Sequence, residues 1–153
     1  LIPGGPTRTA SEMAGLAAVG PDIELIGIHD GARPGTTPQL IEALFNRAAA
    51  VGGAVPALSP EGFAIERESK QVISDVVTVQ TPQVFRAEVL RDAYACAARE
   101  GVSGQDTVEL VLRFTDSRVT TVPGEETNMK ITYPTDLTRV ESALLDRADT
   151  GPR

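Results

Sequence analysis

Residues 24–34 read ELIGIHDGARP, an apolar run that ends abruptly at Asp30, a glycine and an arginine. A continuous apolar run bounded by turn residues is typical of a strand covered on both faces, as in a parallel sheet with helices packed against it. Ligands of such sheets lie outside the carboxyl ends of the strands, which is where Asp30 falls. A carboxylate in this place commonly holds Mg²⁺ together with nucleotide phosphates, and the alternative is an ordinary acid that opens a turn.

The composition indicates one globular domain. At 153 residues and 41% hydrophobic content, the chain can bury a single core, and no apolar run approaches the roughly 20 residues of a membrane span. The net charge of −7 argues against nucleic acid as a partner, because backbone binding needs a basic surface. Any phosphate must therefore be held by a few placed cations, helix N-termini and a metal ion. The single cysteine, Cys96, excludes a disulfide within the chain, and we expect a cytoplasmic protein without a membrane partner.

Sequence patterns divide the chain into alternating helices and strands, which predict a three-layer α/β domain over residues 1–153 with a mainly parallel sheet. Thr9-Ala10-Ser11-Glu12 has the form of a capping box that opens a first helix, and Thr37-Pro38 caps a second one, which ends at Gly52. The other expected elements are a strand at 54–58, a hairpin-like arm over 59–79, a loop at 80–85, a helix that ends at Gly101, a helix after Ser103, strands at 119–122 and 128–133, and a helix from about 134. Alternation in the 128–133 strand places Asn128, Lys130 and Thr132 on one face.

Four separated patches, taken in order, resemble one family. They are GGPTRTAS at residues 4–11, HDGARP at 29–34, QTPQVF at 80–85 and NMKIT at 128–132. This pattern is similar to that of the 2-C-methyl-D-erythritol 4-phosphate cytidylyltransferases, and the related ribitol-5-phosphate cytidylyltransferases share it. The resemblance implies a Rossmann-like α/β fold and a homodimer in which an extended arm from each subunit embraces the other.

The resemblance also implies an activity, which is transfer of CMP from CTP to the phosphate of a sugar alcohol with release of pyrophosphate. Asp30 would then hold Mg²⁺ near the α-phosphate, and Lys130 would stabilise charge at the reacting phosphates. Arg33 and Thr81 would face the phosphate of the sugar alcohol, in a pocket completed by the partner's arm. The cytidine nucleotide would be lined by Gly5, Ser11 and Gly31, and Arg8 would position the first loop.

These residues also have purely structural interpretations. A lysine on a polar strand face, such as Lys130, is usually solvated, Arg33 could pair with a surface acid, and Ser11 could cap its helix. We assign no acid–base role to His29, the only histidine, because joining two phosphates demands cations and positioning more than a proton shuttle.

The sequence departs from the family pattern in several places. The glycine-rich loop with an Arg and a Lys that cradles the triphosphate does not occur, so we interpret the chain as the C-terminal two-thirds of a longer protein and expect residues 1–153 alone not to catalyse transfer. The arm has SPEGFA at 59–64 instead of Asp-Thr, a spacer and Lys, Ile73 lies near an expected arginine, and Gln105-Asp106-Thr107 replaces Thr-Asp-Asp. These changes concern the acceptor more than the nucleotide. Two alternatives therefore stay open, a pentitol-phosphate cytidylyltransferase and a degenerate homologue that dimerises or binds a ligand without catalysis.

Overall fold

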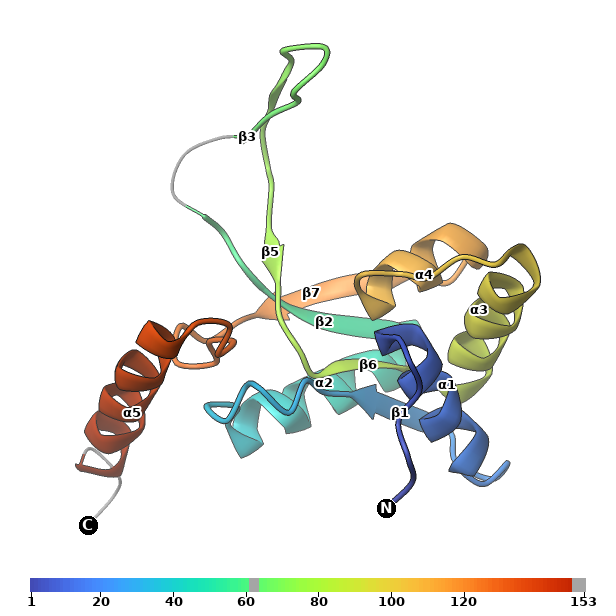
Figure 1. Ribbon diagram of the computed structural model, residues 1–153, viewed down its shortest axis with the longest axis horizontal. Helices are drawn as coiled ribbons and strands as arrows, with labels where there is room; N and C mark the ends of the chain where they lie inside the picture. The colour runs from blue at the N-terminus through green and yellow to red at the C-terminus, as the bar shows by residue number, and fades with distance from the viewer. Residues whose placement is uncertain (61–63, 150–153) are drawn as a thin grey trace.

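A twisted five-stranded sheet forms the centre of the computed structural model, which describes residues 1–60 and 64–149 (Figure 1). The strands of this sheet are β1 (Leu25–Ile28), β2 (Gly53–Leu58), β5 (Thr78–Val79), β6 (Gln83–Arg86) and β7 (Val119–Pro123). Strand β2 pairs with β7 along one edge and with β6 and then β5 along the other. Strands β5 and β6 are thus two parts of one neighbour of β2, separated at residues 80–82.

The strand directions are more mixed than the sequence suggested. Because β6 pairs antiparallel with both β1 and β2, these two strands run in the same direction, and β7 runs parallel to β2. The parallel order expected from the sequence therefore relates β1, β2 and β7, but β6 is inserted in reverse between β1 and β2. The prediction of a loop over residues 80–85 was wrong for 83–85, which are fully buried and belong to β6; Val84 and Phe85 form ladder pairs on both sides.

Helices cover both faces of the sheet, which confirms the predicted three-layer α/β fold. Alternate strand residues point to opposite faces, so Ala54 and Val84 pack in one core and Val55 and Phe85 in the other. The first core is completed by α2 (Pro38–Val51). The second is completed by α1 (Arg8–Ala18), α3 (Ala87–Glu100) and α4 (Thr107–Phe114).

Most helix ends predicted from capping residues agree with the structure. The Thr37 hydroxyl accepts a hydrogen bond from the Leu40 amide at the start of α2, and α3 ends at Gly101 with a left-handed φ of 66°. The predicted capping box at Thr9 was wrong by two residues. Thr7 caps α1 by accepting a hydrogen bond from the Ala10 amide, whereas Thr9 is buried against the segment that precedes α4.

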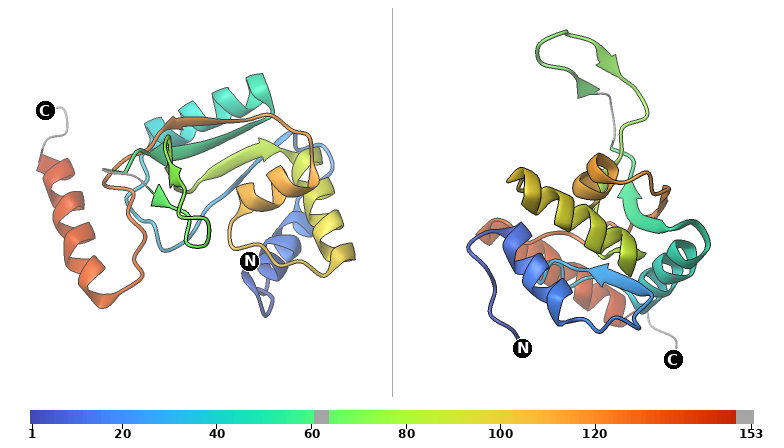
Figure 2. Two further views of the ribbon diagram at one scale, coloured as in Figure 1. Left: turned by 90° about the horizontal axis from the view of Figure 1, so that it is seen from above. Right: turned by 90° about the vertical axis from the view of Figure 1, so that its right-hand side faces the viewer.

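Two elements extend away from the three layers (Figures 1 and 2). One is the predicted arm, where β3 (Ala64–Ile65) and β4 (Val72–Ile73) form a separate antiparallel pair. The other is α5 (Pro134–Asp149). Residues 61–63 of the predicted arm and most of the predicted frayed tail lie outside the described residues. Among the helices that are described, none combines the length and the apolar character that a membrane span requires.

The predicted strand at 128–133 is absent from the described structure, where this segment is a loop between β7 and α5. Alternation of polar and apolar side chains is typical of a strand, but here the polar side chains do not share a solvated face. Asn128 is completely buried, while Lys130 is exposed. The buried Asn128 amide bonds to neighbouring loops, so tertiary contacts replace the ladder that the pattern indicated.

We predict that Gly53→Ala lowers the free energy of unfolding by about 1–3 kcal/mol, because overpacking strains a close-packed core. A Cβ at this position would lie 2.6 Å from Cδ1 of the fully buried Phe85 ring. Gly15→Ala is the matched control. Its added methyl group would meet nothing within 4 Å, so the change should stabilise helix α1 by up to about 1 kcal/mol. Urea unfolding of both variants measures the difference, and equal effects would contradict the packing argument.

Candidate functional site

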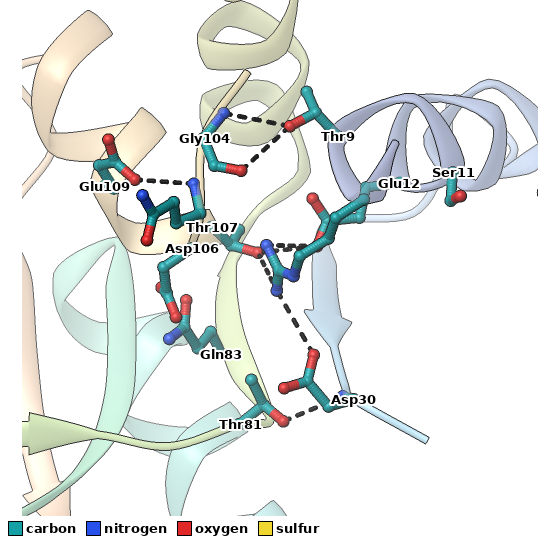
Figure 3. A network of polar contacts seen from close by, with 12 residues as sticks. Thr9, Ser11, Glu12, Asp30, Thr81, Gln83, Gly104, Asp106, Thr107 and Glu109 are labelled. Carbon is teal, nitrogen blue, oxygen red and sulfur yellow. Dashed lines mark hydrogen bonds and ion pairs between the residues drawn. The ribbon is translucent and has the colours of Figure 1, made fainter. Parts of the chain in front are cut away.

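Asp30 lies directly beyond the carboxyl end of β1, as the sequence predicted, and is tied to the start of β6 through Thr81 (Figure 3). The Asp30 amide donates a hydrogen bond to the Thr81 hydroxyl at 3.0 Å. Thr81 is 2% exposed and follows the point at which the chain leaves β5. Two residues 51 positions apart in the sequence are therefore held side by side by this bond.

Three cations converge on the Asp30 carboxylate. Lys130 Nζ lies 3.0 Å from Oδ2, Arg8 Nη2 lies 3.6 Å from Oδ1, and Arg33 Nε lies 3.8 Å from Oδ2. Burial by itself raises the pKa of Asp30, but the hydrogen bond from Lys130 and the charges of the three cations outweigh it and hold the pKa below its ordinary value. Asp30 is therefore a stable anion whose position gathers these cations at one point.

Arg33 is held by one hydrogen bond and one longer ion pair. One terminal nitrogen donates to the Asn128 carbonyl at 2.8 Å, whereas Nε is buried and has no hydrogen-bond partner among the described residues. Nε faces Asp30 Oδ2 at 3.8 Å, so a longer ion pair takes the place of a hydrogen bond there.

A chain of hydrogen bonds fixes the role of His29. The Thr81 hydroxyl accepts from the Asp30 amide, so its own hydrogen is available for His29 Nδ1 at 3.1 Å. His29 Nε2 then donates to the Arg33 carbonyl, which also lies at 3.1 Å. Through these two contacts the imidazole braces the Asp30 loop against Thr81 and Arg33.

The segment that carries Lys130 is held by residues to which the sequence analysis gave no function. Asn128 Nδ2 donates to the Thr81 carbonyl at 2.8 Å, and its Oδ1 accepts from the Thr36 hydroxyl at 2.8 Å. Gln80 fixes Glu125 in both directions, because its amide donates to the Glu125 carbonyl and accepts from the Glu125 N–H. Both Asn128 and Gln80 belong to the quoted sequence patches, but only the folded structure shows that their amides join the two patches.

Gly5 and Ser11 form a separate unit from the Asp30 cluster. The Ser11 hydroxyl accepts from the Gly5 amide at 3.0 Å and also lies 3.0 Å from the Thr7 carbonyl, so it folds the first loop back onto α1. A Cβ on Gly5 would lie 2.5 Å from Ala10 Cβ, which explains the glycine by chain packing. Figure 3 shows Ser11 apart from Glu12 and Asp30. Gly31, in contrast, borders open space, since a Cβ there would meet nothing within 4 Å.

The donor set at Asp30 suits a metal that arrives with phosphates. Among the residues that the structure describes, no three His, Cys, Asp or Glu side chains form a group able to hold a metal ion. Mg²⁺ commonly takes only one or two protein carboxylates and completes its shell with water and phosphate oxygens. A single carboxylate surrounded by cations is compatible with that mode and incompatible with an all-protein cage.

A family match and a sequence relative point to the same kind of protein. The sequence model of the 2-C-methyl-D-erythritol 4-phosphate cytidylyltransferase family matches residues 1–146. A protein of that name from Solibacter usitatus is 34% identical over 157 aligned positions, which cover 97% of this chain and 64% of the relative. The chain thus spans slightly less than two thirds of that relative's length.

Solved structures agree with the sequence comparison. The crystal structure of 2-C-methyl-D-erythritol 4-phosphate cytidylyltransferase from Thermus thermophilus aligns with a TM-score of 0.81 at 34% identity, covering 94% of this chain and 72% of that chain. The crystal structure of 4-diphosphocytidyl-2C-methyl-D-erythritol synthase from Anaerococcus prevotii gives a TM-score of 0.84 at 27% identity, covering 94% and 69%. Because the match extends over nearly the whole chain in both sequence and fold, the chain belongs to the 2-C-methyl-D-erythritol 4-phosphate cytidylyltransferase family.

Proposed function

We propose that the protein to which this chain belongs transfers CMP from CTP to 2-C-methyl-D-erythritol 4-phosphate and releases pyrophosphate. The observation that carries this proposal is the convergence of Arg8, Arg33 and Lys130 on Asp30 at the carboxyl end of β1. The reaction brings two anions together and builds charge on the α-phosphate, so it needs preorganised cations. The same activity is named for the relatives that align with nearly the whole chain.

In this proposal Asp30 arranges the cations before the substrates bind. Lys130 and Arg33 are held at the carboxylate, where their charges can be shared with phosphate oxygens. Arriving phosphates carry more charge than one carboxylate, so they compete for the same donors without requiring the loops to rearrange. Arg8 joins this set because of its contact with Asp30, although the sequence analysis assigned it only to the first loop. The open space at Gly31 leaves room for the nucleotide.

Mg²⁺ is part of the proposal, with Asp30 as its protein ligand. When bound, the ion would neutralise charge at the α-phosphate and polarise it for attack. Asp30 is suited to this role because the surrounding cations hold its pKa low, which keeps the carboxylate ionised.

We also propose a homodimer formed through the arm. Ile65, Val72 and Ile73 on the arm are 45–65% exposed, and this apolar surface would be covered by a second copy. A sedimentation mass equal to a single chain would contradict this part of the proposal.

The acidic net charge gives no reason to expect nucleic acid as a partner, and we place the protein in the cytoplasm.

Lys130→Met tests the central role of the cation cluster. In the protein expressed from its complete native gene, we predict that kcat for CMP transfer falls by about 100-fold or more, because a donor at the developing charge is lost. The Lys130 side chain is 47% exposed, so the variant should fold, with a modest loss of thermal stability because Asp30 keeps only two of its three cations. Arg99→Gln on the exposed face of α3 is the control that removes a positive charge elsewhere. Undiminished turnover of Lys130→Met would refute the assignment.

Asp30→Asn tests the metal role and separates an enzyme from a non-catalytic homologue. We predict that turnover falls by about 100-fold or more and that the Mg²⁺ concentration for half-maximal rate increases, since an amide is a poorer Mg²⁺ ligand than a carboxylate. Asp92→Asn, an exposed position on α3, is the matched control. A binding or dimerising module predicts instead that CTP is not turned over by the native protein and that Asp30→Asn changes nothing.

The acceptor is tested by direct comparison. The second candidate is a pentitol-phosphate cytidylyltransferase, and the arm favours it because Ile73 stands near the place where the methylerythritol enzymes have an arginine. We predict that kcat/KM with 2-C-methyl-D-erythritol 4-phosphate exceeds that with ribitol 5-phosphate by at least about tenfold, because one misfitted polar contact costs this much. A reversed ratio measured with CTP and Mg²⁺ would assign the protein to the second candidate.

A further inference from the structure

Glu12 is a buried acid next to the proposed site, and no role follows for it from the sequence patches. It lies one turn after Arg8 on α1, and its side chain is only 10% exposed. Figure 3 shows it directed toward Thr107 and the Asp30 region. Acids this well buried are rare without a specific partner, so its surroundings carry information.

Both carboxylate oxygens of Glu12 are used. Oε2 accepts from the Tyr94 hydroxyl at 2.6 Å, and Oε1 lies 2.8 Å from Arg8 Nη1 and 3.2 Å from the Thr107 hydroxyl. Tyr94 is 2% exposed, and burial together with the bond to Glu12 raises the pKa of its phenol. Tyr94 is therefore a permanent donor that fixes Glu12 from helix α3.

Arg8 connects this group to the proposed reaction site. Its Nη2 lies 3.4 Å from the Thr107 hydroxyl and 3.6 Å from Asp30 Oδ1, while Nη1 is engaged by Glu12. Thr9 reinforces the arrangement, since its hydroxyl accepts from the Gly104 amide and fastens α1 to the segment before α4. Glu12 thus holds one terminal nitrogen of the guanidinium, and the other terminal nitrogen faces Asp30.

We propose that Glu12 is a positioning residue that holds the Arg8 guanidinium toward Asp30 for the phosphates, with Tyr94 and Thr107 fixing Glu12 in turn. This inference rests on the proposed function, because it gives Arg8 a phosphate to bind.

Glu12→Gln is the decisive substitution because it is isosteric but has one acceptor oxygen. Tyr94 and Arg8 both need an acceptor from this side chain, so one of them must face an amide donor. We expect kcat/KM for CTP to fall 10- to 100-fold in the protein expressed from its complete native gene. In an Arg8→Ala background the same substitution should change kcat/KM by less than twofold, because a positioning residue has nothing left to position. Equal losses in both backgrounds would overturn the proposal.

A second readout does not depend on activity. We expect the guanidinium N–H signals of Arg8, identified by their loss in Arg8→Ala, to be resolved by NMR in the native protein because its contacts restrict rotation. Glu12→Gln should merge them with those of mobile arginines, whereas the control Glu100→Gln, an exposed acid at the end of α3, should not. Unchanged Arg8 signals in Glu12→Gln would overturn the proposal whatever the activity. If Glu12→Gln merges the Arg8 signals as expected but the native protein fails to transfer CMP, the proposed function fails and the positioning role stands.

A rescue variant guards against simple misfolding. Thr107 Oγ1 lies within 3.4 Å of both Arg8 and Glu12, so a carboxylate at position 107 can reach Arg8. When Thr107→Asp is added to Glu12→Val, we expect kcat/KM to increase at least tenfold. The resolved Arg8 signals should return as well. A double variant that folds but remains at the Glu12→Val level in both measurements would contradict the proposal.

Discussion

The structure of the site depends on one electrostatic constraint, which is that a partly buried Asp30 carboxylate must be neutralised. Burial disfavours its charge, and three cations from separate segments reverse that penalty. Each cation then needs support of its own: Glu12 holds Arg8, and the Asn128 carbonyl holds Arg33. Lys130 is placed by its loop, which bonds to the Asp30 segment through the Ile131 amide and the Ala32 carbonyl. The polar contacts around the site therefore either neutralise the Asp30 carboxylate or hold the cations that do so.

Those elements that local chemistry determines were predictable from the sequence. The strand before Asp30, the Thr37 cap and the Gly101 terminus each depend on a few adjacent residues, and the structure has all three. The expectation that this strand is covered on both faces was wrong, because β1 lies at the edge of the sheet and none of its residues is fully buried. The resemblance added the expectation that Asp30, Arg33, Thr81 and Lys130 belong to one site, and the fold brings these four together. Their catalytic roles remain proposals, as do those of Gly5, Ser11 and Gly31.

Elements that depend on distant partners were not predictable. Strand β6 is short and polar at its start, so it resembled a loop until pairing with both β1 and β2 was seen. The 128–133 segment alternates like a strand, but the buried Asn128 amide finds its partners in loops 47 and 92 residues earlier. The spacing of Arg8 and Glu12 was visible in the sequence, whereas their contacts with Tyr94, Thr107 and Asp30 arise only in three dimensions.

The loop between β7 and α5 carries a consequence for how the site is assembled. It delivers Lys130 to a carboxylate 100 positions earlier in the chain, and it has no ladder pairing of its own in the described structure. Its place is therefore set by the side-chain amides of Asn128 and Gln80 and by the backbone bond from Ile131 to Ala32. The charged cluster thus depends on contacts between residues that are far apart in the sequence. Because residues 124–133 belong to neither packed core, the position of the lysine beside its acid is decided by polar contacts alone.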